Sequence, residues 1–441
     1  MNIYILVIFI IYCITLSVNS HKAFLFFTLL QPVINKSFAI MSRPGLPLLS
    51  LNLAICIYTL FYYLLFKKHE LRNFKTFPLI IPFYFYLLSL LLSTLISTLP
   101  LGQSTVKALS YMNDEWLFLF LFWMIITSKK ELTLIFRIYF IIFFVMSLYG
   151  IYEKIIGYNP VMEFEKLLII DQNKIVIQIY TTFERLNVGR IYSFMTHPFT
   201  YGASLAIMIV SNFEILKEHK SKVISYLPTI LASVLMVINI LLTNSRSPLV
   251  FLAISLLGFM NLKNKALKRY LIPFIITLSL SFFVFQDTII VYFENIYSLA
   301  NVEKSSVGGS DLFMRMLQLK TTLNFVANRM FFGLGIGSFN ETNLIGSGIA
   351  GGESVWIQYY LERGIFGVLC YMVFIVFLYK KFRIKNHPTV NRIFFFMITA
   401  WVVFSTITGE MSTRVFFITV ILIMHQLLTP TANLDKSNPK I

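Results

Sequence analysis

Four arginines lie in segments where charge is otherwise scarce. They are Arg185 and Arg190 in ERLNVGRIYSFMTHPFTYG, Arg246 in TNSRSPL and Arg315 in DLFMRMLQLK. The planar guanidinium group of arginine donates two parallel, charge-assisted hydrogen bonds to a phosphate. Several arginines gathered at one membrane surface are therefore suited to hold a lipid diphosphate. The simpler alternative is that each arginine snorkels to lipid headgroups or caps a helix end.

Arg246 is the sharpest candidate of the four because its segment is so short. The residues from Asn244 to Ser247 leave room only for a tight turn, and Pro248 suits the first turn of a following helix. An arginine fixed in such a turn at the end of a membrane span is well placed to contact a ligand headgroup.

Two further candidates stand directly before expected membrane spans. Glu353 precedes SVWIQYYLERGIFG, and His197 precedes Pro198. A glutamate there can bind or deprotonate a sugar hydroxyl, although an ordinary glutamate is a weak base and would need a dry site or an unusual neighbour. The alternatives are a carboxylate favoured by the helix dipole and a histidine that hydrogen-bonds at the membrane interface.

Other charged residues favour structural roles. Glu410 and Arg414 are four residues apart, and this spacing predicts an ion pair in an outer hairpin. Glu362 and Arg363 fall near the outer end of their expected span, where we expect them to pair with polar loops.

The sequence predicts no cofactor and no metal. GLGIGSFNE at 333–341 is rich in glycine, but no strand precedes it as a nucleotide-binding loop requires. The three cysteines lie inside apolar runs, with neither metal-ligand spacing nor a disulfide framework. We also find no acidic cluster or histidine pair that suggests a metal.

The elements that position these residues are membrane helices. Hydrophobic residues make up 57% of the 441 residues and charged residues only 13%. The apolar residues form runs long enough for a helix to cross a hydrocarbon core of about 30 Å. The net charge of +17 would suggest a nucleic-acid partner in a soluble chain. Here the cations lie mostly in short loops between apolar runs, which argues against nucleic acid. The expected fold is therefore an all-α, polytopic membrane protein.

Twelve or thirteen spans are expected, and the second is interrupted by Pro32 and Lys36. The first apolar run is interpreted as a span because it lacks the basic segment of a signal peptide. The expected spans are 2–18, 22–41, 46–66, 77–99, 113–128, 133–152, 197–213, 223–243, 248–262, 270–286, 355–379, 393–408 and 415–428.

The basic residues fall in every second loop, which predicts that those loops are cytoplasmic. These clusters are Lys67, Lys68, Arg72 and Lys75; Lys129 and Lys130; Lys217, Lys220 and Lys222; Lys263, Lys265, Lys268 and Arg269; and Lys380, Lys381, Arg383, Lys385 and Arg392. The opposite loops then face outward, and two of them are long.

The predicted organisation has six parts. The second long outer loop is partly helical from Phe313 to Val326 and then rich in glycine and serine. The parts are N-terminal membrane helices at 1–152, an outer loop at 153–196, central helices at 197–286, the large outer loop at 287–354, C-terminal helices at 355–428 and a cytoplasmic tail at 429–441. Function is expected between the outer loops and the span ends beneath them.

Four segments, taken in order, resemble the O-antigen ligase and polymerase superfamily of bacterial envelope polysaccharide enzymes. The resemblance covers about 190–370 well, and the first 180 residues match only in hydropathy. The segments are Arg190 with THPFTYG, the Ser245 and Arg246 hairpin, Arg315 with GLGIGSF, and ESVWIQYYLERGIFG with Gln358, Glu362, Gly364 and Gly367.

The resemblance implies a membrane glycosyltransferase of the O-antigen polymerase type that uses no sugar nucleotide. Its donor would be a growing glycan on undecaprenyl diphosphate, and its acceptor a repeat unit on the same carrier. The site would face the periplasm or cell exterior from the bacterial inner membrane, in the synthesis of lipopolysaccharide O-antigen or capsule. Membrane lipids, a chain-length regulator and a flippase are the further expected partners.

The resemblance also implies roles for particular residues. Arg190, Arg246, Arg315 and His197 would bind the diphosphate or glycan, and Arg246 and Glu353 would be catalytic. The histidine of the ligases is replaced by Glu353, which favours a polymerase over a ligase. A lipid-linked oligosaccharide flippase is the alternative from another class, but it should carry charged residues deep in several spans.

Overall fold

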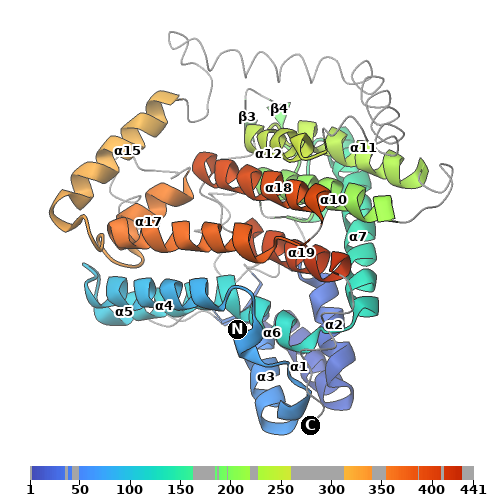
Figure 1. Cartoon of the computed structure of the whole chain (residues 1–441), viewed down its shortest axis with the longest axis horizontal. Coiled ribbons are helices and arrows are strands. Elements are labelled where there is room, and N and C mark those ends of the chain that lie inside the picture. The colour runs from blue at the N-terminus through green and yellow to red at the C-terminus, as the bar shows by residue number, and fades with distance from the viewer. Residues whose placement is uncertain are drawn as a thin grey trace.

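The computed structural model describes residues 2–34, 38–41, 49–161, 184–185, 188–195, 197–218, 227–259, 312–339, 354–385, 387–408 and 412–429. This part of the chain is almost entirely helical (Figure 1). Its strands form two short antiparallel pairs. β1 (Ala39–Met41) lies against β2 (Leu49–Ser50), and β3 (Glu184–Arg185) lies against β4 (Val188–Gly189).

The N-terminal helices are α1 (Ile3–Val18), α2 (Ser20–Leu30), α3 (Leu51–Phe66), the 3-10 turns η1 (Lys68–Glu70) and η2 (Phe74–Thr76), α4 (Ile80–Leu95), α5 (Leu101–Met112), the π-helical turn η3 (Asn113–Leu117), α6 (Phe118–Ile125) and α7 (Lys129–Ile156). The later helices are α10 (Pro198–Glu218), α11 (Leu227–Leu242), α12 (Arg246–Leu257), α15 (Leu312–Val326), the 3-10 turn η5 (Ala327–Arg329), α17 (Val355–Lys381), α18 (Pro388–Ile407) and α19 (Ser412–Leu428).

Most of the expected spans coincide with a helix. The expected span at 270–286 lies outside the described residues. The prediction for 22–41 is wrong in its second half, because α2 ends at Leu30 and residues 39–41 form a strand. Proline lacks a backbone N–H and clashes with the preceding turn, so Pro32 is incompatible with a continuing helix. The sequence analysis did not predict α5, which follows α4 and continues through η3 into α6.

Among the described residues, α7, α17 and α18 are long and apolar enough to cross a membrane. A fourth candidate is α3 together with residues 68–76, which meet at 103°. Five shorter apolar helices accompany them within the described part of the chain. On α17 the exposed apolar residues recur at helical spacing as Ile365, Leu369, Met372 and Val376, as expected for a face in contact with lipid. The protein is therefore an all-α membrane protein.

Two packed helices anchor the C-terminal half of the bundle. α12 and α18 run antiparallel, since Gly258 at the end of α12 lies against Ile393 near the start of α18, and Phe251 contacts Phe404. The ring of Trp401 also stacks on a phenylalanine of α19, Phe417, with 4.6 Å between centroids. This packing places the start of α12 beside the end of α18.

α7 is joined to α10 and α11 by buried hydrogen bonds. The Tyr201 hydroxyl donates to the Met146 carbonyl at 3.0 Å and lies 3.1 Å from Oδ1 of Asn239, whose amide nitrogen donates to the Ser147 carbonyl. A Cβ atom at Gly150 would collide with the Asn239 side chain, so this close approach requires glycine.

One end of the bundle carries two of the basic loops. Lys129 at the start of α7 donates to the carbonyl of Thr429 at 2.6 Å, just beyond the last turn of α19. The negative end of the α19 dipole stabilises a cation at this position. The backbone N–H of Arg72 donates to Met124 O in α6, which brings the loop at 67–75 to the same end. The α11–α12 turn belongs to the opposite end.

Candidate functional site

The α11–α12 turn has the tight geometry that the sequence predicts. α11 ends at Leu242 and α12 begins at Arg246. Asn244 adopts a left-handed conformation with φ of 48°, which asparagine tolerates better than most residues. Pro248 lies in the first turn of α12. The turn therefore fixes the backbone of Arg246 at the end of a helix.

Arg190 is held against this same turn. Its Nε donates to the Thr243 carbonyl at 3.0 Å, and its Nη2 donates to the Ser245 hydroxyl. The neighbouring Ile191 N–H donates to the Leu242 carbonyl at 3.4 Å. Two of the candidate arginines, fifty-odd residues apart in the sequence, are thus brought to one turn of the structure.

The start of α17 lies at the same end of the bundle. The Val355 N–H donates to the carbonyl of Thr408, the residue that follows α18. Because α12 and α18 are antiparallel, the end of α18 and the start of α12 share one end of the bundle. Glu353 itself lies outside the described residues, and Ser354, which follows it, lies close to Thr408.

The other candidate residues lie just before α10, on α15 and in β3. The His197 ring accepts a hydrogen bond from the Phe199 N–H at 3.4 Å and contacts the Phe199 ring, so it caps the start of α10. Arg315 lies on α15 and Arg185 lies in β3.

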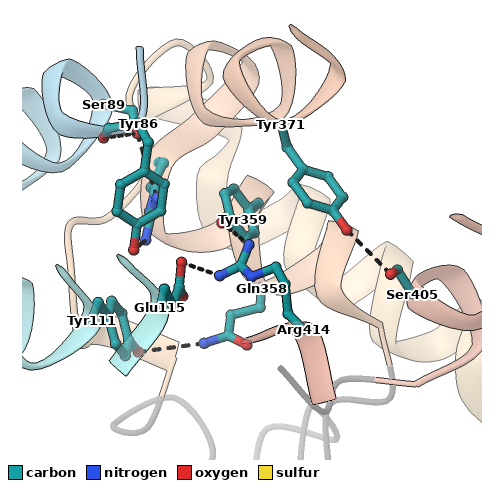
Figure 2. Close-up of polar contacts among 10 residues, drawn as sticks. Tyr86, Ser89, Tyr111, Glu115, Gln358, Tyr359, Tyr371, Ser405 and Arg414 are labelled. Carbon is teal, nitrogen blue, oxygen red and sulfur yellow. Dashed lines mark hydrogen bonds and ion pairs between the residues drawn. The ribbon is translucent and has the colours of Figure 1, made fainter. Parts of the chain in front are cut away.

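A second group of polar residues lies between helices and is drawn in Figure 2. We call it the polar cluster. It consists of Tyr86 of α4, Tyr111 of α5, Glu115 of η3, Gln358, Tyr359 and Arg363 of α17, and Arg414 of α19. Arg414 makes an ion pair with Glu115 and donates to the Tyr359 hydroxyl at 2.9 Å. Both charged side chains of the pair are 5% exposed.

Arg363 occupies the centre of the cluster. Its guanidinium carbon lies 4.7 Å from the ring centroid of Tyr86 and 4.5 Å from that of Tyr359. Aromatic faces attract a cation, and the attraction is stronger where water is excluded. We therefore assign Arg363 a structural role, because its charge is enclosed by protein.

α17 breaks at the polar cluster. Gly364 has φ of 60° and ψ of −160°, which interrupts the helix between two halves. The backbone on either side of the break pairs with residues at and just before the start of the glycine-rich segment: Leu334 N–H donates to Leu361 O at 2.8 Å, and Ile365 N–H donates to Met330 O at 2.8 Å. Irregular backbone at membrane depth is tolerated where protein satisfies its polar groups in this way.

Glu362 secures the glycine-rich segment to the break. Its carboxylate accepts from the Gly337 N–H and from the Tyr111 hydroxyl, both at 3.1 Å. The expectation that Glu362 pairs with a polar loop is therefore met. Arg363 instead pairs with aromatic rings.

The sequence analysis did not predict the polar cluster. Arg414 reaches Glu115, nearly three hundred residues earlier in the chain. The pair of Arg414 with Glu410 stays a prediction, because Glu410 lies outside the described residues. Spacing along one helix reveals neighbours on that helix only. The one available signal was Gly364, whose position within an apolar run suggests a break. Among the described residues, no group of three or more histidine, cysteine, aspartate or glutamate side chains could hold a metal.

Residues 231–372 match the family model described as O-antigen ligase. The O-antigen ligase match covers about a third of the chain and includes Arg246, Arg315, Glu353 and the break at Gly364. Arg190 and His197 precede it. No curated protein matches the chain. The match confirms the resemblance to the O-antigen ligase and polymerase superfamily, and it supports a membrane enzyme of polysaccharide biosynthesis.

Proposed function

We propose that this protein is a polysaccharide polymerase that acts on lipid-linked glycans. The donor is a growing glycan on undecaprenyl diphosphate, and the acceptor is one repeat unit on the same carrier. The product is O-antigen or capsule, made at the outer face of the bacterial inner membrane. The observation that carries the proposal is the contact of Arg190 with the turn that begins α12 at Arg246, at the end of the bundle where α17 starts.

The transfer requires one bond to form and one to break. A hydroxyl oxygen of the acceptor sugar attacks the anomeric carbon of the donor. The bond from that carbon to the diphosphate oxygen breaks, and the diphosphate leaves with the electron pair. The hydroxyl proton passes to a base, for which Glu353 is the candidate. The glycan thereby grows by one unit at its reducing end.

The arginines serve the leaving group. A diphosphate is already a good leaving group, so the site needs positive charge where negative charge develops more than it needs an acid. Arg246 is our first choice for this role, with Arg190 beside it and Arg315 and His197 as further ligands of the diphosphate or glycan. Holding two lipid-anchored substrates together would supply much of the remaining acceleration.

The nearest alternative is a ligase that moves finished glycan to another acceptor. It shares the donor and the arginines with a polymerase. Glu353 stands where the resemblance leads us to expect the histidine of the ligases, and this favours the polymerase. A chain-length regulator and a flippase are the protein partners that a polymerase would need.

The buried charges give the flippase alternative a specific basis. Glu115, Arg363 and Arg414 lie inside the bundle, where a flippase carries charge. Each is 5% exposed or less and is enclosed by protein groups. Charges that line a substrate path should instead face an open cavity, so we favour the enzyme.

Deletion of the gene in its native host tests the proposal. The surface polysaccharide is then analysed on a gel after complementation with the wild type, Arg246→Ala, Glu353→Ala or Arg383→Ala. We expect the deletion to leave glycan with a single repeat unit. The first two variants should fail to restore the long ladder at normal protein levels, whereas Arg383→Ala, in a predicted cytoplasmic loop, should restore it.

Two other results would overturn the proposal. Long polymer that forms but stays on the carrier lipid would identify a ligase. Repeat units that accumulate on the cytoplasmic side of the membrane would identify a flippase.

A further inference from the structure

We propose that Glu153 is a positioning residue that holds Arg190 against the α11–α12 turn. The proposal rests on the assignment of Arg190 to the diphosphate site. Glu153 lies in the last turn of α7, and its carboxylate contacts the backbone of Tyr192 and Ser193. It acts through the four residues from Arg190 to Ser193, which we call the strap.

Glu153 holds the far end of the strap by its backbone. The residue is 4% exposed, and its carboxylate accepts from the Ser193 N–H at 2.8 Å and from the Tyr192 N–H at 3.3 Å. A buried carboxylate is costly unless hydrogen bonds compensate it, and bonds to an ionised acceptor are the stronger kind. The two amides and the carboxylate therefore depend on one another.

The hydroxyl and the carbonyl of Ser193 also make hydrogen bonds. Its hydroxyl donates to the Met146 carbonyl at 3.0 Å, and its carbonyl accepts from the Asn159 amide at 2.7 Å. Ser193 has φ of 55°, a left-handed conformation that a serine adopts only when its surroundings require it. The strap is thus bent into place at the end of α7.

The near end of the strap is the arginine. Arg190 donates to Thr243 O and to the Ser245 hydroxyl, and Ile191 N–H donates to Leu242 O. Only two residues separate Arg190 from Ser193, so the chain between the two anchors spans about 10 Å at full extension. A strap this short cannot shift at Ser193 without shifting Arg190.

Kinetic coupling tests whether Glu153 acts through Arg190. Polymer synthesis by the purified protein is measured from limiting to saturating lipid-linked substrate for Glu153→Ala, Glu153→Gln, Arg190→Ala and the double variant Glu153→Ala/Arg190→Ala. Glu153→Ala should lower kcat/KM about tenfold, mainly by raising KM, and kcat/KM of the double variant should be no lower than that of Arg190→Ala alone. Glu153→Gln, which keeps one carbonyl acceptor, should fall between Glu153→Ala and the wild type. Additive losses would overturn the proposal.

Glu131 provides a matched control. It lies at the other end of α7 and pairs with His21 at 2.5 Å. Glu131→Ala removes a carboxylate from the same helix without touching the strap. Its effect on the rate should be small and should add to that of Arg190→Ala.

A structural measurement separates this inference from the proposed function. Ile191, 1% exposed, is replaced by cysteine in a chain whose three native cysteines are alanine, and the thiol is labelled with a maleimide in detergent. Glu153→Ala should raise the labelling rate several-fold, and Glu131→Ala should leave it unchanged. An unchanged rate in Glu153→Ala overturns the inference whatever the activity. If labelling rises but Arg190→Ala polymerises normally, Glu153 holds the strap and the diphosphate role of Arg190 is wrong.

Discussion

Arg414 and Glu115 form an ion pair that is almost fully enclosed by protein. Removing two ions from water is expensive, and their mutual attraction compensates only when the geometry and surrounding hydrogen bonds are good. Tyr359 provides one such bond to Arg414. The pair therefore specifies how η3, α17 and α19 meet more than it adds net stability.

This reasoning predicts an asymmetry between single and double substitutions. Arg414→Ala strands the Glu115 carboxylate and should lower the free energy of unfolding by about 3–5 kcal/mol. The apolar double variant Glu115→Leu/Arg414→Met should lose less, because no charge is left unpaired. Thermal unfolding of the purified protein in detergent measures both.

The exposed pair between Lys67 and Glu70 is the control. Lys67→Ala should not shift the unfolding temperature measurably, since an exposed pair contributes little. A double variant less stable than Arg414→Ala would contradict the interpretation of the buried pair.

At the scale of elements, the break in α17 joins the polar cluster to the glycine-rich segment. The break places the Glu362 carboxylate against the Gly337 N–H, while the second half of α17 continues as an apolar helix. The loop that follows α15 is thereby fixed to the helix that begins just after Glu353. In the proposed enzyme this connection would couple the outer loop to the site.

Gly364 should be the least replaceable residue of this element. Its φ and ψ suit glycine almost alone, and a Cβ atom would collide with the Met330 carbonyl. Gly364→Ala should therefore abolish the cooperative unfolding transition or the accumulation of folded protein. Size-exclusion chromatography and thermal unfolding in detergent measure these effects.

Gly102 is the matched glycine. It lies in α5, and no atom approaches within 4 Å of the position its Cβ would occupy. Gly102→Ala should leave stability unchanged or raise it slightly, because alanine favours a helix. Equal tolerance of both substitutions would show that the break is not needed for folding.

The apolar runs and turn residues in the sequence predicted most helices and the α11–α12 turn. Run length and the position of Pro248 are local properties, and local properties can be read from one segment at a time. The polar cluster and the Glu153 contacts could not be found in this way. Glu115 and Arg414 meet only after α6, α7 and α19 pack together, and Glu153 looks like an ordinary charge at the end of a helix.

The geometry around the candidate site residues was predicted only in part, for the same reason. Arg190 and Arg246 were both singled out by their residue type and setting, but their shared turn is a product of tertiary packing. His197 drew attention by its place before Pro198, and the structure gives it a local contact with Phe199.

At the scale of the whole molecule, the two ends of the bundle differ. Lys129 and the loop at 67–75 mark one end, and the strap, the α11–α12 turn and the start of α17 mark the other. Exposed apolar side chains cover the helices between them. A membrane enzyme that joins lipid-anchored substrates needs this arrangement, because the lipid carriers hold the reacting sugars close to one surface.

Reconstitution in liposomes tests the central proposal most directly. The purified protein receives undecaprenyl-diphosphate-linked repeat units as its only substrate, and both glycan length and free undecaprenyl diphosphate are measured. We expect polymer and free undecaprenyl diphosphate to increase together. Arg246→Ala should lower the rate of polymer formation at least about a hundredfold, because it removes a group that stabilises the developing negative charge. Arg383→Ala should keep full activity. Repeat units that stay single while the wild-type protein is folded, or polymer that forms equally well with Arg246→Ala, would contradict it.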